Sequence, residues 1–159
     1  MKTLPPGLKR KIVEKMVMFV AEDPREASTG KNRSFHRSLK NALKGIIFTF
    51  MTGRNFRIEV YIFIPTILLG LFLGLTAIEW ALILQSGFLV LALEAKNTSL
   101  ELSVDLSTPG YHYGAKGSKD SASGAVLLVS LAAFIEGILI LGPKVWRVIL
   151  FLLKSAGGI

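Results

Sequence analysis

A long run without a single charged side chain, Val60–Ile78, constrains this fold more than any other feature of the sequence. A helix of that length is about long enough to cross a hydrocarbon layer of ~30 Å. The whole chain is apolar, with a mean hydropathy of +0.51. Because backbone polar groups in lipid must be paired within their own segment, the run predicts a membrane-spanning helix.

Two more apolar stretches follow, so we expect an all-α membrane protein with three transmembrane helices. The predicted spans are residues 55–76, 79–105 and 120–141, with a cytoplasmic loop at 106–119. The link between the first two spans is very short, which predicts antiparallel neighbours. Trp80 suits an aromatic anchor at the far interface. We expect Gly142-Pro143 to end the third span, and residues 142–159 to form an interfacial C-terminal tail.

Residues 34–50 are predicted to form an amphipathic helix that lies in the plane of the headgroups. Apolar residues recur there at helical spacing, at Phe35, Leu39, Leu43, Ile46 and Phe50. Ser34 suits the N-cap position. Residues 1–33 are predicted to be a basic peripheral tail. These regions and the three spans give a membrane domain over residues 34–141.

The net charge is +8, and its distribution along the chain matters more than its size. Residues 1–57 contain 13 of the 19 Lys and Arg but 4 of the 11 acidic residues. Because this basic segment runs directly into an apolar span, an anionic membrane surface is favoured over nucleic acid. The positive-inside rule then places the N-terminal segment and the 106–119 loop in the cytoplasm. The C-terminal Lys144, Arg147 and Lys154 weakly oppose this orientation.

A stripe of polar residues lies at the end of the second predicted span. Glu94, Asn97, Glu101 and Asp105 are offset by three, seven and eleven residues, so they share one helical face. Ionisable side chains in a membrane helix are costly and usually mark a functional path. A metal–phosphate site, a proton relay and a structural charge cluster all fit the stripe at this point.

The 106–119 loop would bring His112, Lys116 and Lys119 to the same interface as the stripe. Carboxylates that hold Mg²⁺, a cation for the transferred group and a base for the acceptor hydroxyl are the requirements of phosphoryl transfer. Such a site could receive ATP from water and a hydroxyl from a lipid. The loop has no GxxxxGK[ST] sequence, so it is not a P-loop. Neither His36 nor His112 has metal-ligand partners at zinc-like spacing.

The segment Glu94–Asp105, EAKNTSLELSVD, resembles the signature E-x-x-N-[ST]-A-I-E-x-x-V-D of the small prokaryotic integral-membrane lipid kinases. That family comprises diacylglycerol kinase and undecaprenol kinase. His112, Lys119-Asp120 and Ser123 are similar to the region that follows the signature, and RNFRI at residues 54–58 is similar to a region before it. The resemblance covers about residues 34–145.

The resemblance implies a surface helix and three transmembrane helices, assembled as a homotrimer in the bacterial cytoplasmic membrane with the site at the cytoplasmic face. It implies transfer of the γ-phosphoryl group of Mg-ATP to a lipid alcohol. Glu94 would then be the catalytic base, and Glu101 a metal ligand. The residues that would bind the nucleotide are Asn97, His112, Lys119, Asp120 and Glu59.

One departure from the family pattern concerns Gly53, where the family usually has a glutamate that holds Mg²⁺ with the second Glu of the signature. A catalytically weak member with a binding or structural role is therefore the alternative hypothesis. An ion-coupled membrane protein would explain the acidic residues but not Lys119-Asp120. RNFRI and the GPKVW sequence at residues 142–146 resemble the undecaprenol kinase branch of the family, and this resemblance favours undecaprenol over diacylglycerol as the substrate. The role of Glu136, an acid inside the third span, stays open.

Overall fold

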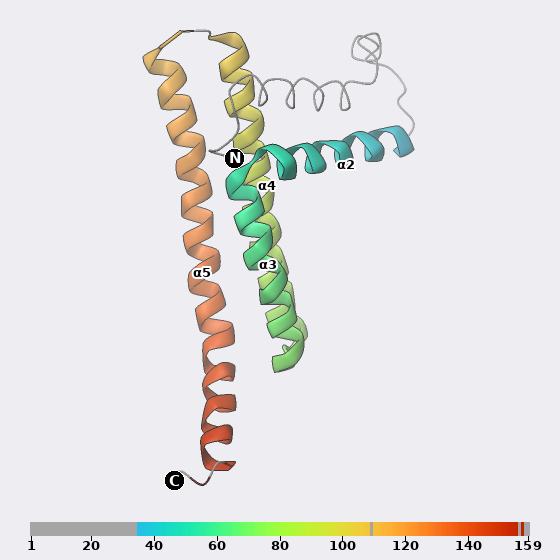
Figure 1. Cartoon of the computed structure of the whole chain (residues 1–159), viewed down its shortest axis with the longest axis vertical. Coiled ribbons are helices and arrows are strands. Elements are labelled where there is room, and N and C mark those ends of the chain that lie inside the picture. The colour runs from blue at the N-terminus through green and yellow to red at the C-terminus, as the bar shows by residue number, and fades with distance from the viewer. Residues whose placement is uncertain (1–34, 109, 156, 158–159) are drawn as a thin grey trace, which may run out of the picture. The chain divides into compact units, whose positions relative to one another are not determined.

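The chain folds into α-helices throughout the part that the structure, a computed structural model, describes: residues 35–108, 110–155 and 157 (Figure 1). The helices are α2 (Phe35–Thr52), α3 (Arg54–Leu73), α4 (Ala77–Ser107) and α5 (Tyr113–Ser155). The all-α prediction is thus confirmed. The predicted basic tail at residues 1–33 and the predicted N-cap at Ser34 lie outside the described residues.

Helices α3, α4 and α5 are each long and apolar enough to cross a membrane. Most of their large hydrophobic side chains are exposed on the helix surfaces. The buried hydrophobic residues in the described ranges are Phe56, Leu75, Ile83, Val90 and Val126. A bundle with an apolar outside and a small core is suited to lipid rather than water, so the protein belongs to the membrane class.

Two compact units divide the chain, Met1–Arg54 and Asn55–Ile159. Helix α2 belongs to the first unit, and it ends where the Gly53 N–H donates to the Thr49 carbonyl at 2.7 Å. The second unit contains α3 from Asn55 onward, α4 and α5. Between Phe35 and Leu73, Gly53 is the one residue outside the helices.

A tight turn joins α3 to α4 and confirms that the two helices are neighbours in a hairpin. Gly74 adopts a φ of 63°, which a glycine reaches without steric cost. Thr76 then caps α4. Its hydroxyl accepts from the Glu79 N–H at 3.3 Å, and the Glu79 carboxylate accepts from the Thr76 N–H at 2.7 Å. This reciprocal capping box pairs two N–H groups at the helix start that would otherwise have no partner.

Close packing at mid-height sets the spacing of α3 and α4. The Phe63 ring stands edge-on to Phe88, with 5.4 Å between ring centroids. The same ring lies over Gly87, where a Cβ atom would approach Phe63 Cε2 to 2.2 Å. Gly87 therefore allows the aromatic ring to pack against the α4 backbone.

Helix α5 runs beside α4 and continues past the α3–α4 turn (Figure 1). Lys144 joins α5 to the α3–α4 turn. Its Nζ pairs with Glu79 Oε2 at 3.1 Å and donates to the Gly74 carbonyl at 3.4 Å. The prediction that Gly142-Pro143 ends this helix is wrong, because the helix continues to Ser155. Proline removes one N–H donor, a loss that membrane helices tolerate.

The loop between α4 and α5 is also shorter than predicted. Helix α4 reaches Ser107 and α5 begins at Tyr113, so much of the expected loop at residues 106–119 is helical. His112 explains the early start of α5. Its carbonyl accepts from the Lys116 N–H at 3.0 Å, and its Nδ1 accepts from the Gly114 N–H at 3.1 Å. The first is the opening backbone bond of the helix, and the second pairs one N–H group of the first turn that has no partner within the helix.

Candidate active site

The polar stripe lies on one uninterrupted helix, α4, as the helical phase predicted. Within the stripe, Glu94 and Asn97 are buried, with 3% and 5% of their surfaces exposed. Glu101 and Asp105 are one and two turns farther along and are exposed. The stripe therefore begins in the packed bundle and ends at its surface.

Glu94 is held by residues from α3. The Asn55 side chain hydrogen-bonds the Glu94 carboxylate from the start of α3. The charges of Glu59 and Glu101 are close enough to repel that of Glu94. Glu94 thus has one acidic neighbour on α3 and one on its own helix, and a cation or a proton would relieve the repulsion within each pair.

Two oxygen atoms near this group have no hydrogen-bond partner. Asn97 donates from Nδ2 to Glu101 Oε1 at 3.2 Å, and this bond turns its Oδ1 elsewhere. Asn97 Oδ1 and Glu59 Oε2 are both buried and accept no hydrogen bond. Buried polar atoms are normally paired, so these oxygens have capacity for a ligand.

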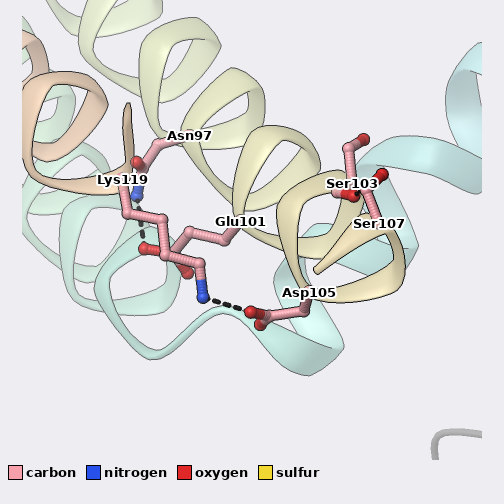
Figure 2. A network of polar contacts seen from close by, with 6 residues as sticks. All are labelled: Asn97, Glu101, Ser103, Asp105, Ser107 and Lys119. Atoms are coloured by element: carbon pink, nitrogen blue, oxygen red, sulfur yellow. Dashed lines mark hydrogen bonds and ion pairs between the residues drawn. The ribbon is translucent and has the colours of Figure 1, made fainter. Parts of the chain in front are cut away.

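Lys119 from α5 completes the polar end of the bundle. Its Nζ pairs with Asp105 of α4, close to Asn97 and Glu101 (Figure 2). Ser103 and Ser107 lie on another side of α4, where each hydroxyl donates to a backbone carbonyl one turn earlier. The acidic stripe, rather than the serine face, therefore meets the lysine.

The other two predicted nucleotide residues lie at the start of α5. Asp120 pairs with Lys116 at 2.6 Å, and both side chains are exposed. His112 is exposed and bonds the first turn of its own helix. The structure thus groups Glu59, Glu94, Asn97 and Glu101, joins Lys119 to the stripe through Asp105, and leaves His112 and Asp120 on the adjoining surface.

A groove of about 630 Å³ opens below the carboxylates, between α3, α4 and α5. Glu59 lines it, and the remaining lining is mainly apolar, with Thr66, Ser86 and Ser130 among the polar exceptions. A polar head and an apolar groove in one bundle suit an amphiphile whose reactive group lies at the top.

The donors of this site fit magnesium, a hard cation that prefers oxygen. Within the described residues no three His, Asp or Glu side chains are close enough to hold a metal ion by themselves. Magnesium usually takes one or two carboxylates and completes its shell with water and phosphate oxygens. Glu101, with the unpaired Asn97 oxygen beside it, meets that smaller requirement.

Sequence reasoning missed the role of Asn55. It lies within RNFRI, which was used only as a point of resemblance. A polar residue directly before an apolar span was the available signal. Its partner Glu94 follows far along the chain, so the contact itself depends on the hairpin.

Three helices that are long and apolar enough to span a membrane, with buried Glu94 and further carboxylates and a lysine toward one end, define an integral membrane protein with an oxygen-rich site at that end. The chain belongs to the prokaryotic diacylglycerol kinase family, whose family model matches residues 40–141. That match covers most of the chain and includes every residue of the predicted site.

Named relatives agree with the family. The chain is 42% identical to a diacylglycerol kinase of Synechocystis over 107 residues, 67% of this chain and 61% of that protein. It is 36% identical to the undecaprenol kinase of Bacillus subtilis over 110 residues, 69% of this chain and 89% of that protein. A Haemophilus influenzae diacylglycerol kinase is 36% identical over 114 residues, 72% of this chain and 89% of that protein. The family and these relatives are lipid kinases.

Proposed function

We propose that this protein transfers the γ-phosphoryl group of ATP to the hydroxyl of a membrane lipid. The observation that carries the proposal is buried Glu94, which shares a helix face with Asn97 and Glu101 and lies one helical turn beyond Val90, a residue that lines the apolar groove. Membership of the lipid kinase family supports the same reaction.

Each residue then has a role in the transfer. Glu94 accepts the proton of the lipid hydroxyl. The oxygen of that hydroxyl attacks the γ-phosphorus, and ADP leaves as its bond to the γ-phosphoryl group breaks. Glu101 and the Asn97 oxygen would hold Mg²⁺, which supplies positive charge to the phosphate oxygens. Lys119 gives up its ion pair with Asp105 and binds a phosphate oxygen of ATP instead. Asn55 orients the base by its hydrogen bond.

Glu59, His112 and Asp120 are proposed to face the nucleotide. Glu59 lies in the groove beside Glu94, whereas the other two lie on the surface that continues from Lys119. Nucleotide approach from water is consistent with their exposure.

The proposed setting is the bacterial cytoplasmic membrane, with the site at the cytoplasmic face and α2 lying among the headgroups. The exposed apolar side of α2 and the basic bias of the N-terminal residues support this orientation. We further propose a homotrimer, as the family resemblance implies.

The proposed lipid is undecaprenol rather than diacylglycerol, on the basis of RNFRI and GPKVW at residues 142–146. The relatives include kinases named for each lipid, so their names favour neither.

The test is phosphorylation of undecaprenol and diacylglycerol in parallel micelle assays with Mg-ATP, with Glu94→Gln as the control. We expect a faster rate with undecaprenol and loss of the rate in the variant. Labelled phosphate in neither lipid would sink the kinase proposal, and a faster diacylglycerol rate would reverse the substrate assignment.

The second candidate function is a catalytically weak family member that keeps a binding role. Gly53 favours it, because the family usually has a metal-binding glutamate there. Binding of Mg-ATP without transfer to either lipid would identify this case.

A further inference from the structure

The family match ends at residue 141. Beyond it α5 continues through Lys144–Ser155, and no side chain of this segment takes part in the proposed phosphoryl transfer. Helix α5 contains 43 residues, about 64 Å at 1.5 Å per residue, whereas a hydrocarbon layer is ~30 Å thick. Lys144 is tied to the α3–α4 turn through Glu79 and Gly74, so the residues after it leave the three-helix bundle (Figure 1).

The side chains of this segment divide between two faces. At about 100° per residue, Lys144, Arg147 and Lys154 fall within roughly 80° of one another. Phe151 is the exception inside that basic wedge. The remaining positions are apolar apart from Ser155, namely Val145, Trp146, Val148, Ile149, Leu150, Leu152 and Leu153.

The apolar face of Lys144–Ser155 is largely exposed. Trp146 is 59% exposed and Leu152 is 58% exposed. Val145, Trp146 and Ile149 line the lower end of the groove, so this face continues the lipid-facing surface of the bundle. Pro143 follows Gly142 and donates no backbone hydrogen bond, which gives the axis a place to bend.

We propose that Lys144–Ser155 forms an anchor for an anionic lipid surface, on the side of the membrane opposite the candidate active site. Its apolar face enters the boundary between headgroups and acyl chains, and Arg147 and Lys154 contact lipid phosphates. Trp146 takes the interfacial position that suits an indole ring.

Charge favours lipid over a second copy of the same segment. Lys144–Ser155 contains three basic residues, Lys144, Arg147 and Lys154, and no acidic residue. Glu79, the acid at this level of α4, is already paired with Lys144. Like segments brought together around a symmetry axis would therefore bring cations together, whereas anionic headgroups would neutralise them.

The test uses the full-length protein in lipid nanodiscs. The chain contains two tryptophans, and Trp80→Phe leaves Trp146 as the only one. Discs of phosphatidylcholine are compared with discs containing equal parts of phosphatidylglycerol. We expect anionic discs to protect Trp146 from acrylamide and to expose it to quenching by brominated lipid. High salt should weaken the protection by screening.

Arg147→Gln with Lys154→Gln should return Trp146 to the accessible state. Near an anionic surface each cation contributes roughly a fivefold preference, so both contribute about 25-fold. The control is Lys96→Gln, which removes an exposed cation on α4, outside Lys144–Ser155. It should leave the quenching of Trp146 unchanged. Circular dichroism checks that each variant is folded.

Two results would overturn the proposal. Protection of Trp146 that is equal in both lipids and insensitive to the double substitution would mean that protein or the acyl core covers it. Free access of acrylamide in both lipids would mean that the segment stands in water.

Discussion

The two ends of the α3–α5 bundle both contain glutamate and lysine and differ in how completely their polar groups are paired. At the turn, Thr76, Glu79, Lys144 and the Gly74 carbonyl satisfy one another. At the other end, Glu59 and Asn97 each keep a buried oxygen without a partner. The closed set joins three helices, and the open set is left ready for a ligand.

The difference teaches how to distinguish structural from functional charges in a membrane bundle. Glutamate and lysine occur at both ends, so residue type alone does not separate them. Complete pairing marks the turn as a clamp, whereas at the site two unpaired oxygens, of Glu59 and Asn97, occur together with the buried Glu94 carboxylate. A single unpaired oxygen, such as the buried Oε1 of Glu136 on α5, does not mark a site by itself. Substitutions made in matched pairs, one at each end, test this distinction.

The largest expected effect comes from Glu94→Gln. Loss of the base should lower the phosphoryl-transfer rate by about 10²- to 10⁴-fold, with the helical circular dichroism unchanged. The matched Glu79→Gln should keep the rate and lower the thermal midpoint. If both variants lost activity equally, the two ends would not differ in function.

Asn97→Leu is expected to have the next largest effect, because it removes the unpaired oxygen beside Glu101. The Mg²⁺ concentration at half-maximal rate should rise by about 10- to 100-fold. Asn97→Asp restores an oxygen ligand and should recover part of the metal dependence. An unchanged Mg²⁺ titration in Asn97→Leu would remove this residue from the metal site.

Lysine substitutions should separate nucleotide binding from stability. Lys119→Met should raise the KM for ATP about tenfold, since a charge-assisted bond to phosphate is lost. Lys144→Met should leave that KM unchanged and lower the thermal midpoint by a few degrees, because the Glu79 contact joins α5 to the turn. If Lys144→Met raised the KM for ATP and Lys119→Met changed only the thermal midpoint, the distinction between the two ends of the bundle would be wrong.

Gly53→Glu has the smallest expected effect. A carboxylate at the position where the family usually has one should lower the Mg²⁺ requirement a few-fold and raise the rate at low metal. Gly53→Gln is the neutral control of similar size. No change in rate or Mg²⁺ dependence would mean that our account of the metal site is wrong.

The sequence was sufficient for the spans and for the stripe, because both follow from local periodicity. Most of Val60–Ile78 lies in α3, and its last residues form the turn and the start of α4. Glu94 and Asn97 lie on one face of α4, as their spacing indicated, and the structure buries both. Glycine and proline misled the prediction at residues 106–119 and 142–143. At the first site His112 supports an early helix start, and at the second one missing N–H does not stop a helix.

Contacts between distant residues could not be predicted from periodicity. The Asn55–Glu94 bond and the Glu79–Lys144 pair each join different helices, so they depend on how α3, α4 and α5 pack. The sequence showed that these side chains were polar residues near the ends of spans, but it did not show which would pair.

The unbroken course of α4 through Glu94, Asn97, Glu101 and Asp105 also limits how the gene can change in length. Inserting or deleting one codon within this segment would turn every later side chain by about 100°. Asp105 would then face away from Lys119, although every amino acid of the site was still present. Residues 108–112 connect two helices, so length variants are expected to be tolerated there and rejected within the stripe.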